Sequence, residues 1–202
     1  MLAPFCPHAP LPTWFTDARP TTVQCFDYGN SETDDRDDGA GAMEAIYFGN
    51  ARWHSNTGAG ATGPWVGADL EAGMYYGGGS QTKVNNQSQA LPFDFVSLVL
   101  KGWEDGFLLK GGDATRGKQT LMYNGSRPFQ PGSPGRKHHY QPMRKQGAII
   151  LATGGDDSNS AQGNFYEGFM ATGVASEATD AAIHANIVAA GYSGWNAPEP
   201  LQ

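Results

Sequence analysis

The sequence is poor in charge, in cysteine and in long apolar runs, and each shortage narrows the kind of protein it can encode. Charged residues make up 16% of the 202 residues, and the formal net charge is −7, so the surface would repel the phosphates of nucleic acid. No apolar run approaches the length that crosses a bilayer, so we expect no transmembrane helix. The two cysteines, Cys6 and Cys25, allow one disulfide and require none.

Several familiar signatures are also missing. No glycine-rich loop is followed by the Lys-Ser/Thr pair of a phosphate-binding loop, and no Gly-x-Ser-x-Gly or Cys/His nucleophile arrangement is present. Residues 1–12 contain four prolines and no basic region ahead of an apolar stretch, which is unlike a signal peptide. The sequence therefore predicts no cofactor.

Glycine, proline and aromatic residues are abundant instead. The chain has 28 Gly and 13 Pro, and aromatic residues make up 11%, a composition that favours many short strands joined by turns within one domain. One helix is expected over 177–190, with Ser176 as its N-cap and Gly191 at its end. The expected strands are 43–48, 64–74, 93–100, 103–109, 120–123, which ends at an Asn124-Gly125 turn, 148–153 and 165–172. Residues 1–24 are expected to form an irregular Pro-rich leader, and 196–202 a tail.

Two acidic motifs carry the chemistry that the sequence offers. Asp69 and Glu71 are two residues apart on the predicted strand, so their side chains face the same side. Burying both without partners is costly, and their face is therefore either ordinary solvent-exposed sheet or a cleft. The nearby aromatic residues favour a cleft, because sugars stack on aromatic rings and donate hydroxyl hydrogens to carboxylates. They are Trp53, Trp65, Tyr75 and Tyr76.

The second motif is Gly154-Gly155-Asp156-Asp157, directly after an apolar strand. Paired glycines let the backbone approach a ligand closely, although an ordinary Gly-Gly-Asp turn has the same sequence. Two carboxylates from separate strands are the minimum equipment for glycosidic cleavage: one protonates the leaving oxygen, and the other attacks the sugar or activates water.

Two further clusters favour simpler interpretations. The acidic run at 34–38 is typical of a solvated loop, with calcium binding as the alternative, but it lacks the regular spacing and distal Glu of a calcium loop. Adjacent His138 and His139, in a basic loop over 128–145, would point to opposite faces of a strand and make poor joint metal ligands. No metal site is predicted.

Several longer segments resemble a known family. These are Cys25-Phe-Asp-Tyr-Gly-Asn30, Gly39 to Asn50, Lys145 to Leu151, Gly154-Gly-Asp-Asp-Ser-Asn159, Ala161 to Gly168 and Asn186 to Ala190. In this order they look like the catalytic domain of fungal α-L-arabinofuranosidase B, glycoside hydrolase family 54. The resemblance runs from about Cys25 to Tyr192, so we expect a partial catalytic domain over 25–195.

The resemblance implies a concanavalin/laminarinase-like β-sandwich (jelly roll), mostly β, incomplete, with one C-terminal helix. It implies a secreted, extracellular enzyme that releases terminal arabinofuranose from the plant cell-wall polysaccharides arabinan and arabinoxylan, with retention. By matching position, Glu71 is the nucleophile and Asp156 the general acid/base. Asp69, Trp53, Cys25 and the Gly155 backbone would line the arabinose subsite.

The chain departs from the family at three points. The family has two adjacent cysteines at the sugar site, where this chain has Gln24-Cys25. It usually has an Asn after the nucleophile, where this chain has Ala72. The family's domain also has about as much chain again before Cys25, and a β-trefoil after it. The rival hypotheses are a non-catalytic or vestigial arabinose-binding sandwich and a calcium-dependent lectin that uses residues 34–38.

Overall fold

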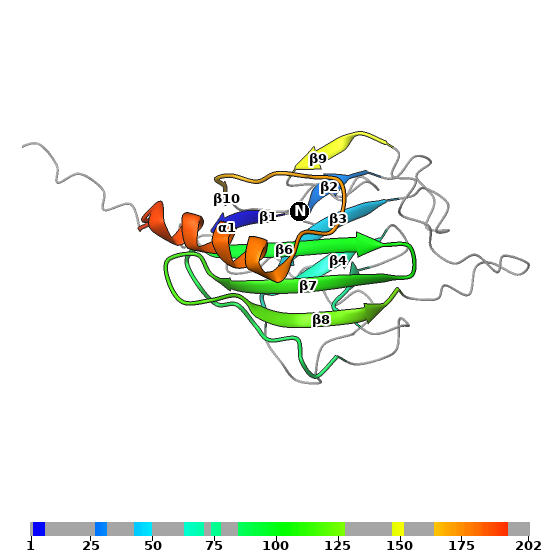
Figure 1. Ribbon diagram of the computed structural model, residues 1–202, viewed down its shortest axis with the longest axis horizontal. Helices are drawn as coiled ribbons and strands as arrows, with labels where there is room; N and C mark the ends of the chain where they lie inside the picture. Colours follow the sequence, from blue (N-terminus) through cyan, green and yellow to red (C-terminus); the bar gives the residue numbers. More distant parts are fainter. Residues whose placement is uncertain are drawn as a thin grey trace, which may run out of the picture.

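Two antiparallel five-stranded sheets packed face to face form the body of the protein (Figure 1). In the computed structural model, the residues described are 2–6, 27–31, 43–49, 63–70, 74–77, 85–127, 147–151 and 164–193. The strands are short and rich in β-branched and aromatic residues, as the composition predicts. A mostly β sandwich with one C-terminal helix is confirmed.

The first sheet has the strand order β10-β1-β6-β7-β8. Its strands are β1 (Leu2–Cys6), β6 (Val96–Trp103), β7 (Gly106–Asp113), β8 (Thr120–Ser126) and β10 (Asn164–Phe165). The hairpin between β6 and β7 closes where Trp103 pairs with Gly106, which leaves a two-residue turn at Glu104 and Asp105.

The second sheet has the order β5-β4-β3-β2-β9. Its strands are β2 (Asp27–Asn30), β3 (Glu44–Gly49), β4 (Trp65–Asp69), β5 (Met74–Tyr75) and β9 (Ile149–Leu151). All pairings in both sheets are antiparallel, so each strand can present alternate side chains to the core and to the outside.

The core lies between the sheets and follows this alternation. Ile46 and Phe48 from β3, with Val66 and Ala68 from β4, pack against the first sheet. The first sheet contributes a matching set from β6, β7 and β8: Val96, Leu98, Leu100, Phe107, Leu109 and Met122. The alternate residues of each strand therefore face outward, which fixes the outer face of each sheet.

Helix α1 (Glu177–Ala189) covers the outer face of the first sheet, in front of β6 and β7 in Figure 1. The Ser176 hydroxyl accepts a hydrogen bond from Thr179 N at 3.1 Å, and Gly191 follows the helix with φ of +72°, a backbone conformation that favours glycine. Both predicted ends are confirmed. The apolar contact is small, with Ile187 packing against Phe95, Val99 and Ala114.

The strand predicted over 64–74 is wrong. β4 ends at Asp69, and β5 returns antiparallel, with Asp69 paired to Met74. The chain therefore reverses direction between these residues, where the sequence shows no Asn-Gly or Pro-Gly signal to mark the turn.

Four other predictions also differ from the structure. The strand predicted over 103–109 runs across the turn at Glu104 and Asp105, so Trp103 ends β6 and Gly106 begins β7. β8 continues through Asn124 and Gly125, which pair with Leu108 and Phe107, so ladder pairing overrides the local turn signal. The strand predicted over 165–172 is reduced to β10. Within the expected irregular leader, residues 2–6 form β1 between β6 and β10, a non-local pairing that no periodicity marks. The proline at position 4 fits because β10 pairs only with Phe5 and Cys6, so that side of β1 has no ladder at this residue.

Among the described residues, no helix has the length and apolar character needed to cross a membrane.

Candidate functional site

The outer face of the second sheet holds the one predicted site residue that the structure describes, Asp69. Val66 and Ala68 of β4 lie in the core, so Asp69, with Trp65 and Gly67, points to the opposite side. Asp69 is 5% exposed. A carboxylate so well covered is rarely found without partners. Because Asp69 is the predicted site residue that the structure describes, its face is the candidate site.

A second carboxylate, Asp27, lies on the same face. Asp27 pairs with Tyr47 of β3, and Gly29 pairs with Ala45, which in turn pairs with Asp69. Asp27 and Asp69 therefore flank β3 from two different strands, and Asp27 is fully buried. Sequence reasoning missed Asp27, although the alternation through Cys25, Asp27 and Gly29 places all three on one side of an extended chain.

Aromatic rings form the floor between these strands. The Tyr76 ring lies 5.8 Å from that of Trp65 and 6.1 Å from that of Tyr47, both edge-on. A Cβ at Gly67 would come within 3.1 Å of the Tyr76 ring, so the glycine lets the rings lie against β4. All three rings are buried, so Trp65 and Tyr76 support the face instead of offering a free stacking surface, contrary to the sequence hypothesis. Tyr75 packs into the core.

A buried ion pair ties this sheet to the other at the end of β3. Glu44 lies 3.3 Å from Arg127, and their side chains are 2% and 4% exposed. Arg127 Nε also donates to Trp103 O at 2.8 Å. Gly102 is required here, because a Cβ would lie 2.0 Å from Glu44 Oε1. Glu44 shares the core side of β3 with Ile46, so we assign it a structural role in holding β3 in place. No sequence pattern singles it out.

The other predicted site residues, Glu71, Asp156, Trp53, Cys25 and Gly155, lie outside the described residues. Their sequence positions are nevertheless informative. Cys25 precedes β2, Trp53 follows β3, Glu71 follows β4, and Gly155 and Asp156 follow β9, each by five residues or fewer. All of them therefore attach to strands of the second sheet, and none attaches to the first.

Chain connectivity limits how far apart the two predicted catalytic carboxylates can lie. Leu151 pairs with Tyr28, Tyr28 with Ile46, and Ile46 with Ala68, so three strand spacings, about 14 Å, separate β9 from β4. The five residues from Leu151 to Asp156 span at most about 17 Å. Asp156 is thus within reach of the end of β4, where Glu71 follows Asp69 by two residues.

Within the described part of the chain, no three His, Cys, Asp or Glu side chains are grouped closely enough to hold a metal ion. The acidic run at 34–38 and the pair His138 and His139 lie outside it, so calcium binding there stays a sequence-based alternative.

Comparison of the sequence and the fold with known proteins identifies a family to which this chain is similar. The profile of the family "Alpha-L-arabinofuranosidase B, catalytic" matches residues 15–193, and so begins inside the segment expected to be an unrelated leader. A probable alpha-L-arabinofuranosidase B from Aspergillus fumigatus is 48% identical over 170 residues, which are 84% of this chain and 31% of that protein.

Two solved structures are similar in fold at 37% sequence identity. One, with a TM-score of 0.75, is a Glu-to-Gln variant of a GH54 arabinofuranosidase soaked with 4-nitrophenyl arabinofuranoside; the match covers 95% of this chain and 36% of that one. The other is an arabinofuranosidase complexed with arabinofuranosyl-alpha-1,2-xylobiose, with a TM-score of 0.74 and coverage of 95% and 35%. The chain thus spans about a third of the length of the proteins it matches.

Proposed function

Because this chain belongs to the family of alpha-L-arabinofuranosidase B catalytic domains, we propose that it is a glycoside hydrolase that releases terminal α-L-arabinofuranose with retention. The observation that carries the proposal is that every predicted site residue lies on, or within five residues of, a strand of one sheet. That sheet presents Asp27 and Asp69 on its outer face.

In the proposed mechanism, Glu71 attacks the anomeric carbon and Asp156 protonates the leaving oxygen. Water then hydrolyses the glycosyl-enzyme, with Asp156 acting as base. Retention requires the two carboxyl groups about 5–5.5 Å apart, and the reach of the segment after β9 permits that separation. A carboxylate near Asp156 would favour its protonated form at the start of the cycle.

Asp69 has a binding role in this proposal. Its position at the last residue of β4 brings its carboxylate close in sequence to Glu71 without placing it at the reacting carbon. A carboxylate there can accept hydrogen bonds from arabinose hydroxyls, and such bonds strengthen in the transition state. Trp53, Cys25 and the Gly155 backbone complete the proposed subsite.

We propose arabinan and arabinoxylan as the polysaccharide substrates and an extracellular site of action. A similar solved structure holds arabinofuranosyl-alpha-1,2-xylobiose, which supports substrates with arabinose on a xylose backbone. The net charge of −7 is compatible with a neutral sugar polymer and unfavourable for an anionic one.

Hydrolysis of 4-nitrophenyl α-L-arabinofuranoside tests the proposal. Glu71→Gln should lower kcat by more than about 10³-fold, because an amide cannot attack the sugar. Glu167→Gln is the matched control, since Glu167 accepts a hydrogen bond from Tyr192 at 2.6 Å and follows β10 of the first sheet by two residues. Its rate should equal that of the parent protein. Proton NMR of the first-formed arabinose should show the retained anomer. Unchanged turnover in Glu71→Gln would refute the assignment of the nucleophile.

A second candidate function is arabinose binding without turnover. Two observations favour it: Gln24 in place of the first of two cysteines, and Ala72 in place of an Asn. Calorimetry with arabino-oligosaccharides separates the two functions, since heat of binding without released arabinose supports only the second.

A further inference from the structure

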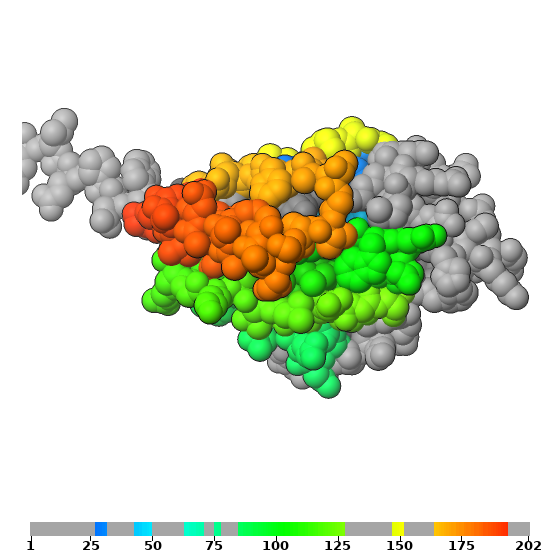
Figure 2. Space-filling model, in the orientation of Figure 1, coloured from blue at the N-terminus to red at the C-terminus, as the bar shows by residue number. Residues whose placement is uncertain are grey.

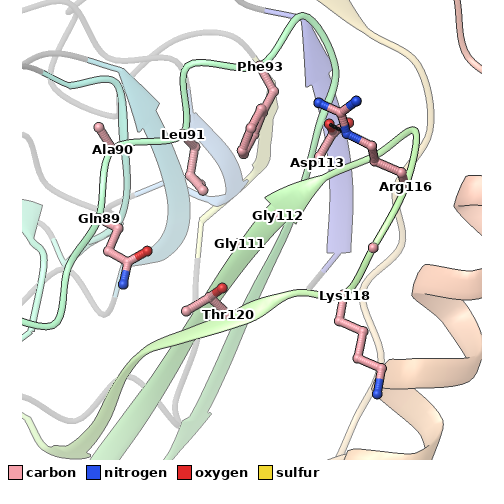
Figure 3. A pocket seen from close by; sticks show the side chains of 11 residues that line it. Gln89, Ala90, Leu91, Phe93, Gly111, Gly112, Asp113, Arg116, Lys118 and Thr120 are labelled. Carbon is pink, nitrogen blue, oxygen red and sulfur yellow. Dashed lines mark ion pairs between the residues drawn. The ribbon is translucent and has the colours of Figure 1, made fainter.

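A cleft of about 320 Å³ lies at the rim of the sandwich, away from Asp69. It opens between the segment 89–93, the end of β7 at Gly111 to Asp113, and the turn 116–120 that leads into β8 (Figure 3). Leu91 N donates to Pro64 O at 2.8 Å, which places the cleft at the start of β4. Asp69 stands at the other end of that strand, about 13 Å along it.

Both walls of the cleft are fixed by contacts of their own. On one side, Leu91 is 3% exposed and packs in the core, and Phe93 N donates to Leu91 O at 2.8 Å. On the other side, Asp113 accepts hydrogen bonds from Thr115 N and Thr115 Oγ1 at 2.9 and 2.6 Å and contacts Arg116 Nε at 2.9 Å. A cleft with rigid walls does not need to be ordered by its ligand.

The lining combines one aromatic ring with spaced polar groups. Phe93 packs one part of its ring against the core and is half-buried, so the remainder faces the cleft. Figure 3 shows Phe93 and the Asp113–Arg116 pair toward one end, and Gln89 and Thr120 toward the other. A ring for the apolar face of a sugar, with amide, hydroxyl and guanidinium groups for its hydroxyls, is the chemistry of a carbohydrate subsite.

The charges of the cleft disfavour an anion. Arg116 is already paired with Asp113, whose pKa is lowered because hydrogen bonds from Thr115 and the charge of Arg116 outweigh its burial. The ionised Asp113 would repel a phosphate or a uronate. Lys118 also lines the cleft, and in Figure 3 its side chain extends away from Phe93 and Gln89. A neutral, polyhydroxylated ligand therefore fits best.

We propose that this cleft binds a neutral sugar residue of a polysaccharide main chain, away from the residue that is cleaved. The choice of a plant polysaccharide rests on the proposed function, whereas the cleft and its chemistry do not. Binding at the rim would hold the polymer while the outer face of the second sheet acts on a side-chain arabinose, which raises the effective concentration of substrate.

Three variants of the full chain test the inference. Gln89→Ala changes an exposed residue, and Phe93→Ala removes the ring, with Phe93→Leu as a variant that better preserves the packing. The matched control is Gln87→Ala, which changes an exposed glutamine that does not line the cleft. Thermal unfolding of each variant confirms that it is folded.

The measurements are affinity electrophoresis in arabinoxylan and NMR titration with xylohexaose. We expect Gln89→Ala and Phe93→Ala each to weaken binding about fivefold, Gln87→Ala to leave it unchanged, and the amide signals of Gly111, Gly112 and Gly117 to shift in the parent protein. Equal binding by all variants, or shifts that avoid these glycines, would overturn the inference.

The rate on 4-nitrophenyl α-L-arabinofuranoside separates this inference from the proposed function. Phe93 and Gln89 do not touch so small a substrate at Asp69, so their variants should hydrolyse it at the parent rate. Turnover without xylohexaose binding would overturn the proposal of sugar binding in the cleft and leave the proposed hydrolase function intact. Cleft-dependent binding without turnover in the parent protein would overturn the hydrolase proposal and leave the cleft supported.

Discussion

The outer face of the first sheet carries Lys101 and Lys110 beneath helix α1, whereas the outer face of the second sheet carries Asp27 and Asp69 beside aromatic rings. Under the helix, Asp180 lies 2.5 Å from Lys101 and 2.6 Å from Lys110, and all three side chains are less than 10% exposed. Lys110 also pairs with Glu177 of the helix. These contacts raise the pKa of Lys110 despite its burial.

The two faces therefore use buried charge differently. Under α1 the charges neutralise one another and dock a helix whose apolar contact is small, which is a structural task. The described residues of the other outer face carry two acidic side chains, Asp27 and Asp69. Asp27 and Asp69 lie on strands β2 and β4, next to the segments that contain the predicted site residues Cys25 and Glu71. This arrangement is expected of a binding face. Substitutions should accordingly cost stability on the first face and activity on the second.

The largest expected effect is that of Asp180→Ala on stability. Removing the shared carboxylate leaves Lys101 and Lys110 buried without their main partner, which should lower the free energy of unfolding by about 3–5 kcal/mol. Urea denaturation measures this loss. Glu177→Gln is the control, because its side chain is 82% exposed, and it should cost less than about 1 kcal/mol. Equal losses of unfolding free energy in both variants would contradict a stabilising role for the buried ion pairs of Asp180.

Asp69→Asn should lower activity strongly and stability only slightly, which is the reverse of the effect of Asp180→Ala. The side chain keeps its size and loses its charge, so the free energy of unfolding should change by about 1 kcal/mol. The value of kcat/KM on an aryl arabinofuranoside should fall about 10²-fold, equivalent to about 2.7 kcal/mol of transition-state stabilisation. The exposed Asp94→Asn provides a matched control. A variant that loses stability and keeps its activity would assign Asp69 to structure and abolish the contrast between the faces.

A smaller effect concerns pH and again belongs to the first face. His184 Nδ1 lies 2.8 Å from Ser97 Oγ beneath the helix, and burial lowers the pKa of His184, while Asp113 and the backbone at Arg116 and Gly117 partly oppose the shift. A lowered folded-state pKa means that the unfolded chain binds the proton more readily. The stabilising contribution is therefore complete above about pH 6.5 and is lost as the pH falls toward the folded-state value.

Urea denaturation from pH 7 to pH 5 should show this loss, with a slope of at most about 1.4 kcal/mol per pH unit. His184→Gln should flatten the profile over that range, which lies above the usual titration of Asp and Glu. An unchanged slope in the variant would place the titrating group elsewhere.

The smallest expected effect lies at β9, an edge of the second sheet. Ile149 and Leu151 are 60% and 45% exposed, and Figure 2 shows β9 in yellow at the upper surface of the molecule. Exposed apolar side chains on an edge strand promote association between molecules. Ile149→Thr should change the free energy of unfolding by less than about 0.5 kcal/mol and should reduce concentration-dependent association in sedimentation velocity. Unchanged association in Ile149→Thr would show that the molecules do not associate through the β9 edge.

The sequence predicted the features whose signals are local. The helix was found because Ser176 and Gly191 mark its ends, and β3 and β9 because short apolar runs precede clear breaks. The turn after Asp69 and the continuation of β8 through Asn124 and Gly125 depend on strand pairing, which a local pattern does not contain. β1 was missed for the same reason, since its partners lie about ninety or more residues away.

The candidate site shows the same division. The acidic motif was enough to single out Asp69. Its place on the outer face, opposite Val66 and Ala68, and the burial of Trp65 and Tyr76 depend on the pairing of β4 with β3, which carries Tyr47. The role of Glu44 could not be predicted, because its partner Arg127 lies 83 residues away on the other sheet.

The central claim is that the outer face of the second sheet is catalytic and that Glu71 is its nucleophile. An arabinofuranose-configured reagent that traps a nucleophilic carboxylate, followed by peptide mass spectrometry, tests it most directly. We expect a single arabinosyl adduct on the peptide that contains Glu71, absent in Glu71→Gln and present in Glu167→Gln. An adduct on a carboxylate of the first sheet, or no adduct in the parent protein, would contradict the claim.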